Sequence, residues 1–209
     1  MIRQALDSWG MRVWSPTITI FDLEYTAWEC SMARHWLTPG EYREVVQIGA
    51  VKLNADSFAE LDSFDALVRP RINTRLSAYF QNLTGITQDA VTARGMDFAD
   101  AYARFLEFVG DGPIAAFGRD SQVLTDNLRL YGIEDARPLP VFYDLRGWFA
   151  VQGMDPRGML SCDIAPALGV PFVGQAHNAL NDARSLAAGM AALAARGGVR
   201  ITTRVGAAA

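Results

Sequence analysis

A short apolar segment that ends in two acidic residues most limits what this chain can fold into. Residues 17–24 read T-I-T-I-F-D-L-E, and their β-branched side chains favour a buried strand. Because side chains alternate between the two faces of a strand, Asp22 and Glu24 fall on the same face. Their carboxylates then lie about 6.6 Å apart along the strand. Two desolvated acids this close repel each other, so the segment predicts a cation site, with a divalent metal as the usual occupant.

A second group of titratable residues stands near the end of the chain, in A-H-N-A-L-N-D-A-R-S-L-A-A-G-M. A long helix rich in Ala and Leu is predicted to begin at about Asn178, a favourable N-cap residue. His177 then lies in the loop before the helix, and Asp182 lies in its first turns. If this helix packs beside the first strand, both residues reach the site of the first two acids. The second histidine, His35, has no such context, and we expect a surface or packing role for it.

A third candidate acid lies in the middle of the chain. The segment P-I-A-A-F-G-R-D-S-Q-V-L-T-D-N-L predicts a short buried strand, a glycine break and a helix that starts near Asp120. Asp120 would stand at the carboxyl end of that strand, where open α/β sheets place their sites. Asp126 is the alternative, about a turn and a half further along the helix. The apolar residues Val123 and Leu124 are spaced to pack the helix on the sheet, which favours Asp120.

These motifs together resemble the DEDDh group of DnaQ-like 3′–5′ exonucleases. The matching segments are D-L-E at 22–24, G-R-D at 118–120 and H-N-A-L-N-D at 177–182. In addition, N-L-T-G-I-T at 82–87 is similar to the second motif of the branch that contains ribonuclease T, KapD and the ERI enzymes. The resemblance covers about residues 18–193. One departure is that nearer relatives usually have W-G-x-x-D as the middle motif, whereas this chain has F-G-R-D, which leaves Asp126 open as the third acid.

The chemistry that these residues suit is metal-dependent hydrolysis. Oxygen ligands favour Mg²⁺ or Mn²⁺ over zinc, and two such ions can activate water and stabilise a leaving oxygen. The resemblance implies that Asp22 contacts both ions, that Glu24 and Asp182 complete the shell of the first, and that Asp120 holds the second. It also implies that His177 is the general base.

The resemblance further implies that the terminal nucleotide is contacted by Tyr25 and by the loop of Thr84, Gly85 and Ile86. We therefore expect a metal-dependent 3′–5′ exonuclease that acts on single-stranded RNA or DNA 3′ ends and releases nucleoside 5′-monophosphates, with RNA slightly favoured. Two other functions stay open: a catalytically weak nucleic-acid-binding adaptor and a polymerase-associated DNA proofreading subunit. A homodimer is an expectation taken from ribonuclease T relatives.

The remaining pattern predicts an α/β, ribonuclease H-like fold with a mixed central sheet flanked by helices. An antiparallel meander of strands at about 13–23, 43–53 and 58–70 comes first, with a hairpin turn at 54–57. A helix at 97–109, strands at 113–117 and 141–143, the helix from 120 and two further helices follow. The loop at 26–42 is expected beside the site. We expect the tryptophans, Tyr102, Phe105 and Phe117 to be core residues.

Length and composition fit one compact enzyme. The 209 residues suit an exonuclease domain at 13–196, with an N-terminal leader at 1–12 and a C-terminal tail at 197–209 that we expect to be partly disordered. No apolar run approaches the length of a membrane span, and two cysteines cannot build a disulfide framework, so a cytoplasmic location without membrane contact is expected. The net charge of −4 is unusual for a nucleic-acid binder, but bound divalent ions would add positive charge at the site.

Overall fold

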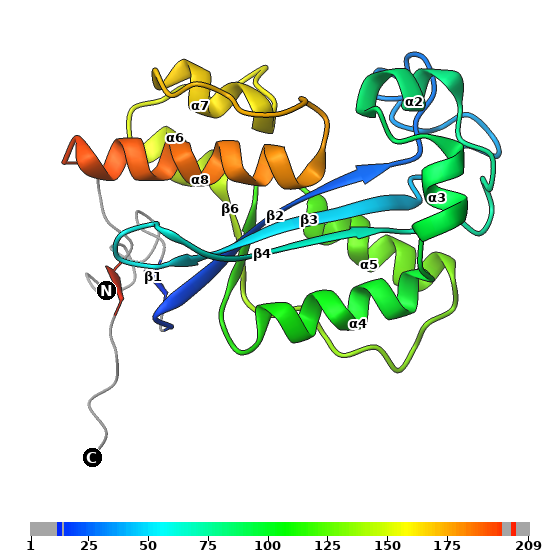
Figure 1. Cartoon of the computed structure of the whole chain (residues 1–209), viewed down its shortest axis with the longest axis horizontal. Coiled ribbons are helices and arrows are strands. Elements are labelled where there is room, and N and C mark those ends of the chain that lie inside the picture. The colour runs from blue at the N-terminus through cyan, green and yellow to red at the C-terminus, as the bar shows by residue number, and fades with distance from the viewer. Residues whose placement is uncertain (1–11, 14, 198–201, 204–209) are drawn as a thin grey trace, which may run out of the picture.

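The computed structural model describes residues 12–13, 15–197 and 202–203, with side chains for 15–197. A central sheet carries helices on both of its faces (Figure 1). Its five strands have the spatial order β4-β3-β2-β5-β6. They are β2 (Thr17–Tyr25), β3 (Val45–Asn54), β4 (Glu60–Leu67), β5 (Ile114–Ala116) and β6 (Phe142–Asp144). The first three form an antiparallel meander, and β5 and β6 run parallel to β2. The predicted mixed α/β sheet of the ribonuclease H-like type is therefore confirmed.

The helices form two layers and an end cap. In Figure 1, α8 and α7 lie on one face of the sheet, α4 and α5 lie on the other, and α2 and α3 stand at one end of the meander. The helices are α2 (Ala78–Thr84), α3 (Gln88–Arg94), α4 (Phe98–Val109), α5 (Asp120–Leu130), α6 (Leu145–Val151), α7 (Ile164–Ala167) and α8 (Ala179–Ala195), with a 3₁₀ turn, η1 (Ser161–Asp163), before α7. A separate two-residue pairing joins β1 (Arg12–Val13) to β7 (Thr202–Thr203).

The alternation of side chains along β2 divides the core into two halves. Ile18 and Ile20 pack in the cluster that includes α8, α7 and α6. Phe21 and Leu23 pack in the cluster on the α4 and α5 side. β2 is buried along almost its whole length, as a central strand covered on both faces must be. The face that carries Ile18 and Ile20 continues to Asp22 and Glu24, so those two acids lie on the α8 side.

The structure corrects two parts of the predicted element order. The first strand starts at Thr17 rather than near Val13, because a bend at Ser15–Pro16 interrupts the chain and proline lacks the N–H that a ladder needs. The strand also continues past Leu23, since Tyr25 still pairs with Val45 on β3. The sequence interpretation contained no helices at 78–94, where α2 and α3 lie. The predicted helix at 97–109, the helix from Asp120 and the Asn178 cap of the last helix are confirmed.

The ends of the chain lie mostly outside the described residues. This applies to the predicted leader at 1–12 and to the predicted tail at 197–209, apart from the β1 and β7 backbone and Gly197. Within the described part of the chain, no helix has both the length and the apolar character that crossing a bilayer requires.

Candidate active site

A glycine on β3 lets the last helix approach the acids of β2. Gly49 pairs with Asp22 across the β2–β3 ladder. A Cβ atom at Gly49 would lie 2.1 Å from the backbone nitrogen of Leu180, which no real side chain tolerates. The first turn of α8 therefore rests directly on the backbone of β3. This close contact brings Asp182, on that same turn, to the sheet face that carries Asp22 and Glu24.

Side-chain hydrogen bonds fix the start of α8 at this position. The buried Gln47 lies opposite Glu24 on β3, and its Oε1 accepts a hydrogen bond of 3.0 Å from the Ala179 N–H. Gln47 is itself held, because its Nε2 donates to Asp65 at 2.8 Å. The side chain of Asn178 caps the helix by accepting from the Asn181 N–H. Two of the N–H groups that a helix start leaves free are satisfied in this way.

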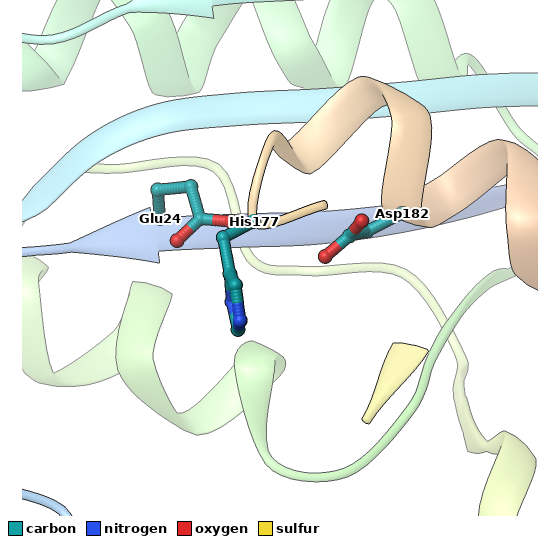
Figure 2. A group of neighbouring side chains, drawn as sticks. All are labelled: Glu24, His177 and Asp182. Carbon is teal, nitrogen blue, oxygen red and sulfur yellow. The ribbon is translucent and has the colours of Figure 1, made fainter. Parts of the chain in front are cut away.

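Three of the predicted site residues come within reach of one ion. Ligand atoms of Glu24, His177 and Asp182 all lie within 4.8 Å of one another. Figure 2 shows Glu24 on β2 and Asp182 on α8, with His177 in the preceding loop between them in this view. His177 adopts a left-handed backbone conformation with φ of 58°, which is uncommon for a residue other than glycine. Such strain is often found at functional positions.

The structure separates the two candidates for the third acid. Asp120 is the first residue of α5, directly after β5 and the left-handed Gly118, and it lines the same cleft as Asp22 and Glu24. Asp126 is not among the residues that line this cleft. Its carboxylate instead pairs with Arg43 at 3.4 Å and accepts a hydrogen bond from Gln122. The placement thus favours Asp120 as the third acid.

The cleft between β2, α8 and the segment after β2 has a volume of about 470 Å³. Its walls combine the acids with aromatic and basic side chains. The lining includes Asp22, Glu24, Asp120, His177 and Asp182, the aromatic residues Tyr25, Trp28, Trp36, Tyr79, Phe80 and Phe117, and the arginines Arg43, Arg119 and Arg146. The predicted position of the loop at 26–42 beside the site is confirmed by its contribution to this wall.

Burial makes the acid cluster hard to ionise. Desolvation raises the pKa of Asp22 to about 7, although a hydrogen bond from Ser161 opposes the shift. It raises the pKa of Asp182 to about 8, with the charge of Asp22 as a second cause. Burial and then the charge of Asp22 raise the pKa values of Glu24 and Asp120. Burial lowers the pKa of His177, so this imidazole is neutral near pH 7 and able to accept a proton.

Within the described residues, one buried carboxylate oxygen of the cluster lacks a hydrogen-bond partner. Asp182 Oδ1 is buried and accepts no hydrogen bond from the described residues. A buried carboxylate oxygen without a donor is costly, and coordination to a cation would satisfy it. Together with the mutual repulsion of four acids, this orphaned oxygen shows that the residues fit a divalent metal. Oxygen-rich donors of this kind suit Mg²⁺ or Mn²⁺.

Of the four residues that were predicted to contact the substrate, only one lines the cleft. Tyr25 lines the cleft. Thr84, Gly85 and Ile86 do not: Thr84 and Ile86 are buried, and Gly85 ends α2 with a φ of 72°. The Thr84 hydroxyl donates to the Phe80 carbonyl and accepts from the Ile86 N–H, so it stabilises the turn between α2 and α3. Substrate contact stays a prediction for all four.

Sequence reasoning missed the residues that support the acids from distant elements. Ser161 in η1 donates a hydrogen bond to Asp22. The sequence around it, M-L-S-C-D, contains no motif that predicts this contact. Arg119 and Arg146 add positive charge at the cleft. Arg146 pairs with Asp144, whereas Arg119 has no ion pair within the described part of the chain. The tryptophans and Phe117 were predicted to be core residues. Trp148 is buried, and Trp36 and Phe117 pack against core clusters while they also line the cleft. Trp28 lines the cleft and belongs to no core cluster of the described residues, and Trp9 and Trp14 lie outside the residues whose side chains are described.

Comparison with known proteins assigns the family. The pattern of the RNase T exonuclease family matches residues 19–189, which include every predicted site residue. The chain belongs to the RNase T exonuclease family. The resemblance to DnaQ-like 3′–5′ exonucleases is thereby confirmed. This RNase T family chain is 38% identical over 93 residues to 3′-5′ exoribonuclease 1 of Rattus norvegicus, and 38% identical over 95 residues to the Homo sapiens protein of the same name. The matches cover 44% and 45% of this chain but only 24% of each relative.

Solved structures support the same fold for this RNase T family member. The nuclease domain of 3′hExo, a DEDDh family member bound to rAMP, has a TM-score of 0.74 at 23% identity. That likeness covers 91% of this chain and 98% of the other. Cell-death related nuclease 4 (CRN-4) has a TM-score of 0.71 at 20% identity and covers 88% of this chain and 66% of the other. At these identities the likeness concerns the fold.

Proposed function

We propose that this chain is a metal-dependent 3′–5′ exonuclease that hydrolyses the terminal phosphodiester bond of single-stranded nucleic acid and releases nucleoside 5′-monophosphates. The observation that carries the proposal is the cleft lined by four acids and His177, in which Asp182 Oδ1 is buried and accepts no hydrogen bond from the described residues. A pure binding module has no need for buried acids that resist ionisation. The family match supports the reaction class.

The metal site is assigned to oxygen ligands from three parts of the chain. Asp22 and Glu24 from β2, Asp182 from α8 and Asp120 from α5 would hold two Mg²⁺ or Mn²⁺ ions. The ions would polarise the phosphate and stabilise the charge that develops on the leaving oxygen. The hydrogen bond from Ser161 to Oδ1 of Asp22 fixes the orientation in which this carboxylate would meet the ions.

The other polar residues of the cleft would activate the attacking water and bind the phosphates of the strand. His177, neutral because burial lowers its pKa, accepts the proton of the attacking water as general base. Arg119 and Arg146 stand at the cleft, where their guanidinium groups can bind phosphate oxygens of the strand. Tyr25 lies beside the acids and is available to contact the terminal nucleotide.

RNA is the favoured substrate. The support is the name of the relatives, 3′-5′ exoribonuclease 1, with which this chain shares 38% identity over part of its length. The chain spans about a quarter of those relatives, so selectivity that depends on their other regions is not transferred.

The direct test uses 5′-labelled single-stranded RNA and DNA of one sequence, incubated with Mn²⁺ or with EDTA. We expect a ladder that shortens from the 3′ end, faster on RNA, and that disappears with EDTA and in Asp22→Ala. The pair Asp120→Ala and Asp126→Ala serves as a matched control, because both residues lie on α5 and only Asp120 lines the cleft. If Asp126→Ala loses turnover and Asp120→Ala keeps it, Asp126 is the third acid instead of Asp120. If the wild-type protein shortens neither strand, the proposed exonuclease function is wrong.

A further inference from the structure

The last parallel strand of the sheet also ends in an acid. β6 pairs with β5, and Asp144, its last residue, lies opposite Ala116, the last residue of β5. Both strands end at the same edge of the sheet, where β5 is followed by the turn that leads to Asp120. Asp144 itself does not line the cleft of the acids, but Arg146, two residues later, does. The carboxylate of Asp144 is therefore placed to contact two parts of the cleft wall.

The two oxygens of this carboxylate have different partners. Oδ1 accepts a hydrogen bond of 3.1 Å from the Gly118 N–H, in the turn between β5 and α5. It also accepts from the Arg146 N–H at 3.0 Å and so caps α6. Oδ2 accepts from the Arg146 guanidinium, at 2.6 Å from Nη2 and 3.1 Å from Nε, and Nε is shared with Oδ1. Oδ1 thus holds mainly backbone N–H groups, and Oδ2 holds a cationic side chain.

The turn at Gly118 is also in contact with Arg146. Gly118 has a φ of 119°, a conformation that residues with a side chain rarely adopt. The guanidinium of Arg146 packs on the open side of this glycine, since a Cβ atom placed there would lie 3.5 Å from Cζ. Gly118, Asp120 and Arg146 all line the same cleft. The turn that presents Asp120 and the guanidinium of Arg146 therefore form one unit, which Asp144 joins.

The same D-x-R pattern recurs at residues 155–157 and shows what is particular to the first. The Arg157 N–H and Nε donate to Asp155 Oδ1 at 3.1 and 2.9 Å, and Nη2 donates to Oδ2 at 2.7 Å. Neither of these two residues lines the cleft. The pattern alone therefore produces the ion pair. The hydrogen bond from Gly118 and the place in the cleft are features of the pair at 144–146.

The ion pair fixes the direction of the Arg146 guanidinium. The side chains of Arg146 and Asp144 are 45% and 38% exposed, and exposed pairs contribute little to stability. Nε and Nη2 both face Asp144, whereas Nη1 donates no hydrogen bond to the residues whose side chains are described. Arg119 also lines the cleft, but no hydrogen bond or ion pair within that part of the chain holds its side chain. Of the two arginines, Arg146 is the one with a free edge in a fixed position.

From these contacts we infer that Asp144 is a positioning residue of the cleft, with a separate task for each of its oxygens. Oδ1 fixes the turn before Asp120, and so the place where this acid meets a metal ion. Oδ2 directs the Nη1 edge of Arg146 toward the phosphate of the nucleotide that is released. The inference rests on the proposed function and deepens it, because it makes metal binding and phosphate binding depend on one side chain. A planar guanidinium held on one side is well suited to a phosphate oxygen on the other.

The test measures two affinities by calorimetry on the full chain: that for Mn²⁺ alone, and that for adenosine 5′-monophosphate (AMP) in saturating Mn²⁺. AMP is a product of the proposed reaction and so stays intact. The variants are Asp144→Asn, Asp144→Ala and Arg146→Ala, with Asp155→Asn as the matched control from the second D-x-R pattern. In Asp144→Asn the amide oxygen satisfies the two backbone N–H groups, which are fixed, and the amide nitrogen faces the movable guanidinium. This variant therefore keeps the contact with Gly118 and loses the ion pair.

Asp144→Asn should weaken AMP binding about 2- to 10-fold, because the freed guanidinium must be ordered again when the phosphate binds. Its Mn²⁺ affinity should stay near that of wild type. Arg146→Ala should weaken AMP binding about 10- to 100-fold. In the Arg146→Ala background, Asp144→Asn should add no further loss, because the two residues act as a pair. Asp144→Ala should lose about 10-fold in Mn²⁺ affinity as well, and Asp155→Asn should change neither affinity.

Three results would overturn the inference. The first is wild-type AMP affinity in Asp144→Asn, and the second is an equal loss from this substitution whether or not Arg146 is present. The third is wild-type Mn²⁺ affinity in Asp144→Ala. If Asp144→Ala does not fold, as judged by circular dichroism, Asp144→Ser replaces it, because serine can still cap α6 but is one bond shorter toward Gly118.

These outcomes are distinct from those of the proposed function. If Mn²⁺ and AMP binding follow the expected pattern but the wild type shortens no strand, the positioning role stands and the exonuclease proposal fails. If the wild type shortens strands and Asp144→Asn binds AMP as tightly as wild type does, the positioning role fails and the exonuclease proposal stands. No binding of AMP by the wild type in Mn²⁺ would overturn the assignment of the phosphate to Arg146.

Discussion

Ser161 Oγ donates a hydrogen bond of 2.7 Å to Asp22 Oδ1, although 139 residues separate the two in the chain. Both side chains are buried, so the bond acts in a medium of low polarity. It holds the Asp22 carboxylate in one orientation and opposes the rise of its pKa that burial causes. We therefore expect Ser161 to act as a positioning residue for Asp22 in the proposed metal site.

The first prediction concerns this bond. Ser161→Ala should lower kcat about 10- to 100-fold, because a hydrogen bond to a charged group contributes about 1.5–3 kcal/mol. The Mn²⁺ concentration for half-maximal rate should rise as well, and Ser161→Thr should restore most of the loss. Metal titrations of the exonuclease rate measure these effects.

Ser185 offers a matched control for that experiment. It is also buried, but its hydroxyl accepts from the Ala165 N–H and donates to the Cys162 carbonyl rather than to an acid. Ser185→Ala should reduce stability and leave the metal dependence of the rate unchanged. Equal metal dependence in the two variants would show that Ser161 merely supports the fold.

The second prediction concerns the contact between β3 and α8. Gly49→Ala should reduce both stability and turnover, since the added methyl would meet the backbone of Leu180 and push the first turn of α8 away from Asp22. A loss of about 1–3 kcal/mol in the free energy of unfolding is expected. Thermal denaturation and oligonucleotide turnover measure the two effects.

Gly147 in α6 is the control for this substitution. No atom lies within 4 Å of a Cβ placed there. Gly147→Ala should leave turnover intact and raise stability by about 0.5–1 kcal/mol, because alanine loses less conformational freedom in a helix than glycine does. If Gly49→Ala kept wild-type turnover, the close contact between Gly49 and the first turn of α8 would not be needed for the active site.

The third prediction separates a base from a ligand at His177. The imidazole lies close enough to Glu24 and Asp182 to share an ion with them, but it is proposed to accept the proton of water. His177→Ala should lower kcat about 10²- to 10⁴-fold while Mn²⁺ affinity, measured by calorimetry, stays close to wild type. His35→Ala alters the other histidine, which is exposed and lines the same cleft but is not in the group of possible metal ligands, and it should retain most of the turnover. Loss of Mn²⁺ binding in His177→Ala would make His177 a ligand instead.

The parts of the site that could be predicted depend on local signals. The alternation of a strand places Asp22 and Glu24 on one face, and the Asn178 cap places Asp182 in the first turns of a helix. Each of these follows from a few neighbouring residues. The same reasoning put Asp120 at a strand end, where the structure has it, and away from Asp126.

The parts that could not be predicted depend on contacts between distant segments. Ser161 reaches Asp22 only because η1 packs under α8, and no pattern around Ser161 indicates this. The glycine at 49 resembles any strand glycine until α8 lies on it. Trp28 was expected in the core because residue type alone cannot tell a core aromatic side chain from one that lines a cleft. The short helices α2 and α3 were missed, since seven residues show little periodicity.

The last prediction concerns the cost of ionising Asp182. Its pKa is raised to about 8 in the folded protein, above the ordinary aspartate value, so the folded state holds a proton that the unfolded state releases between about pH 4 and pH 8. Stability from this group is full below about pH 4 and is lost as the pH rises toward 8. In EDTA, Asp182→Asn should therefore become more stable than wild type as the pH rises, by on the order of a few kcal/mol at pH 8.

Urea denaturation at pH 5, 6.5 and 8 measures this difference. Mn²⁺ should reverse it at pH 8, because a cation stabilises the ionised carboxylate that wild type has and the variant lacks. Asp155→Asn is the control: Asp155 is exposed and paired with Arg157, which holds its pKa below the ordinary value, so its substitution should give no gain that grows with pH. If wild type and Asp182→Asn lose the same stability in EDTA as the pH rises from 5 to 8, the pKa of Asp182 is not raised in the folded chain, and the prediction is wrong.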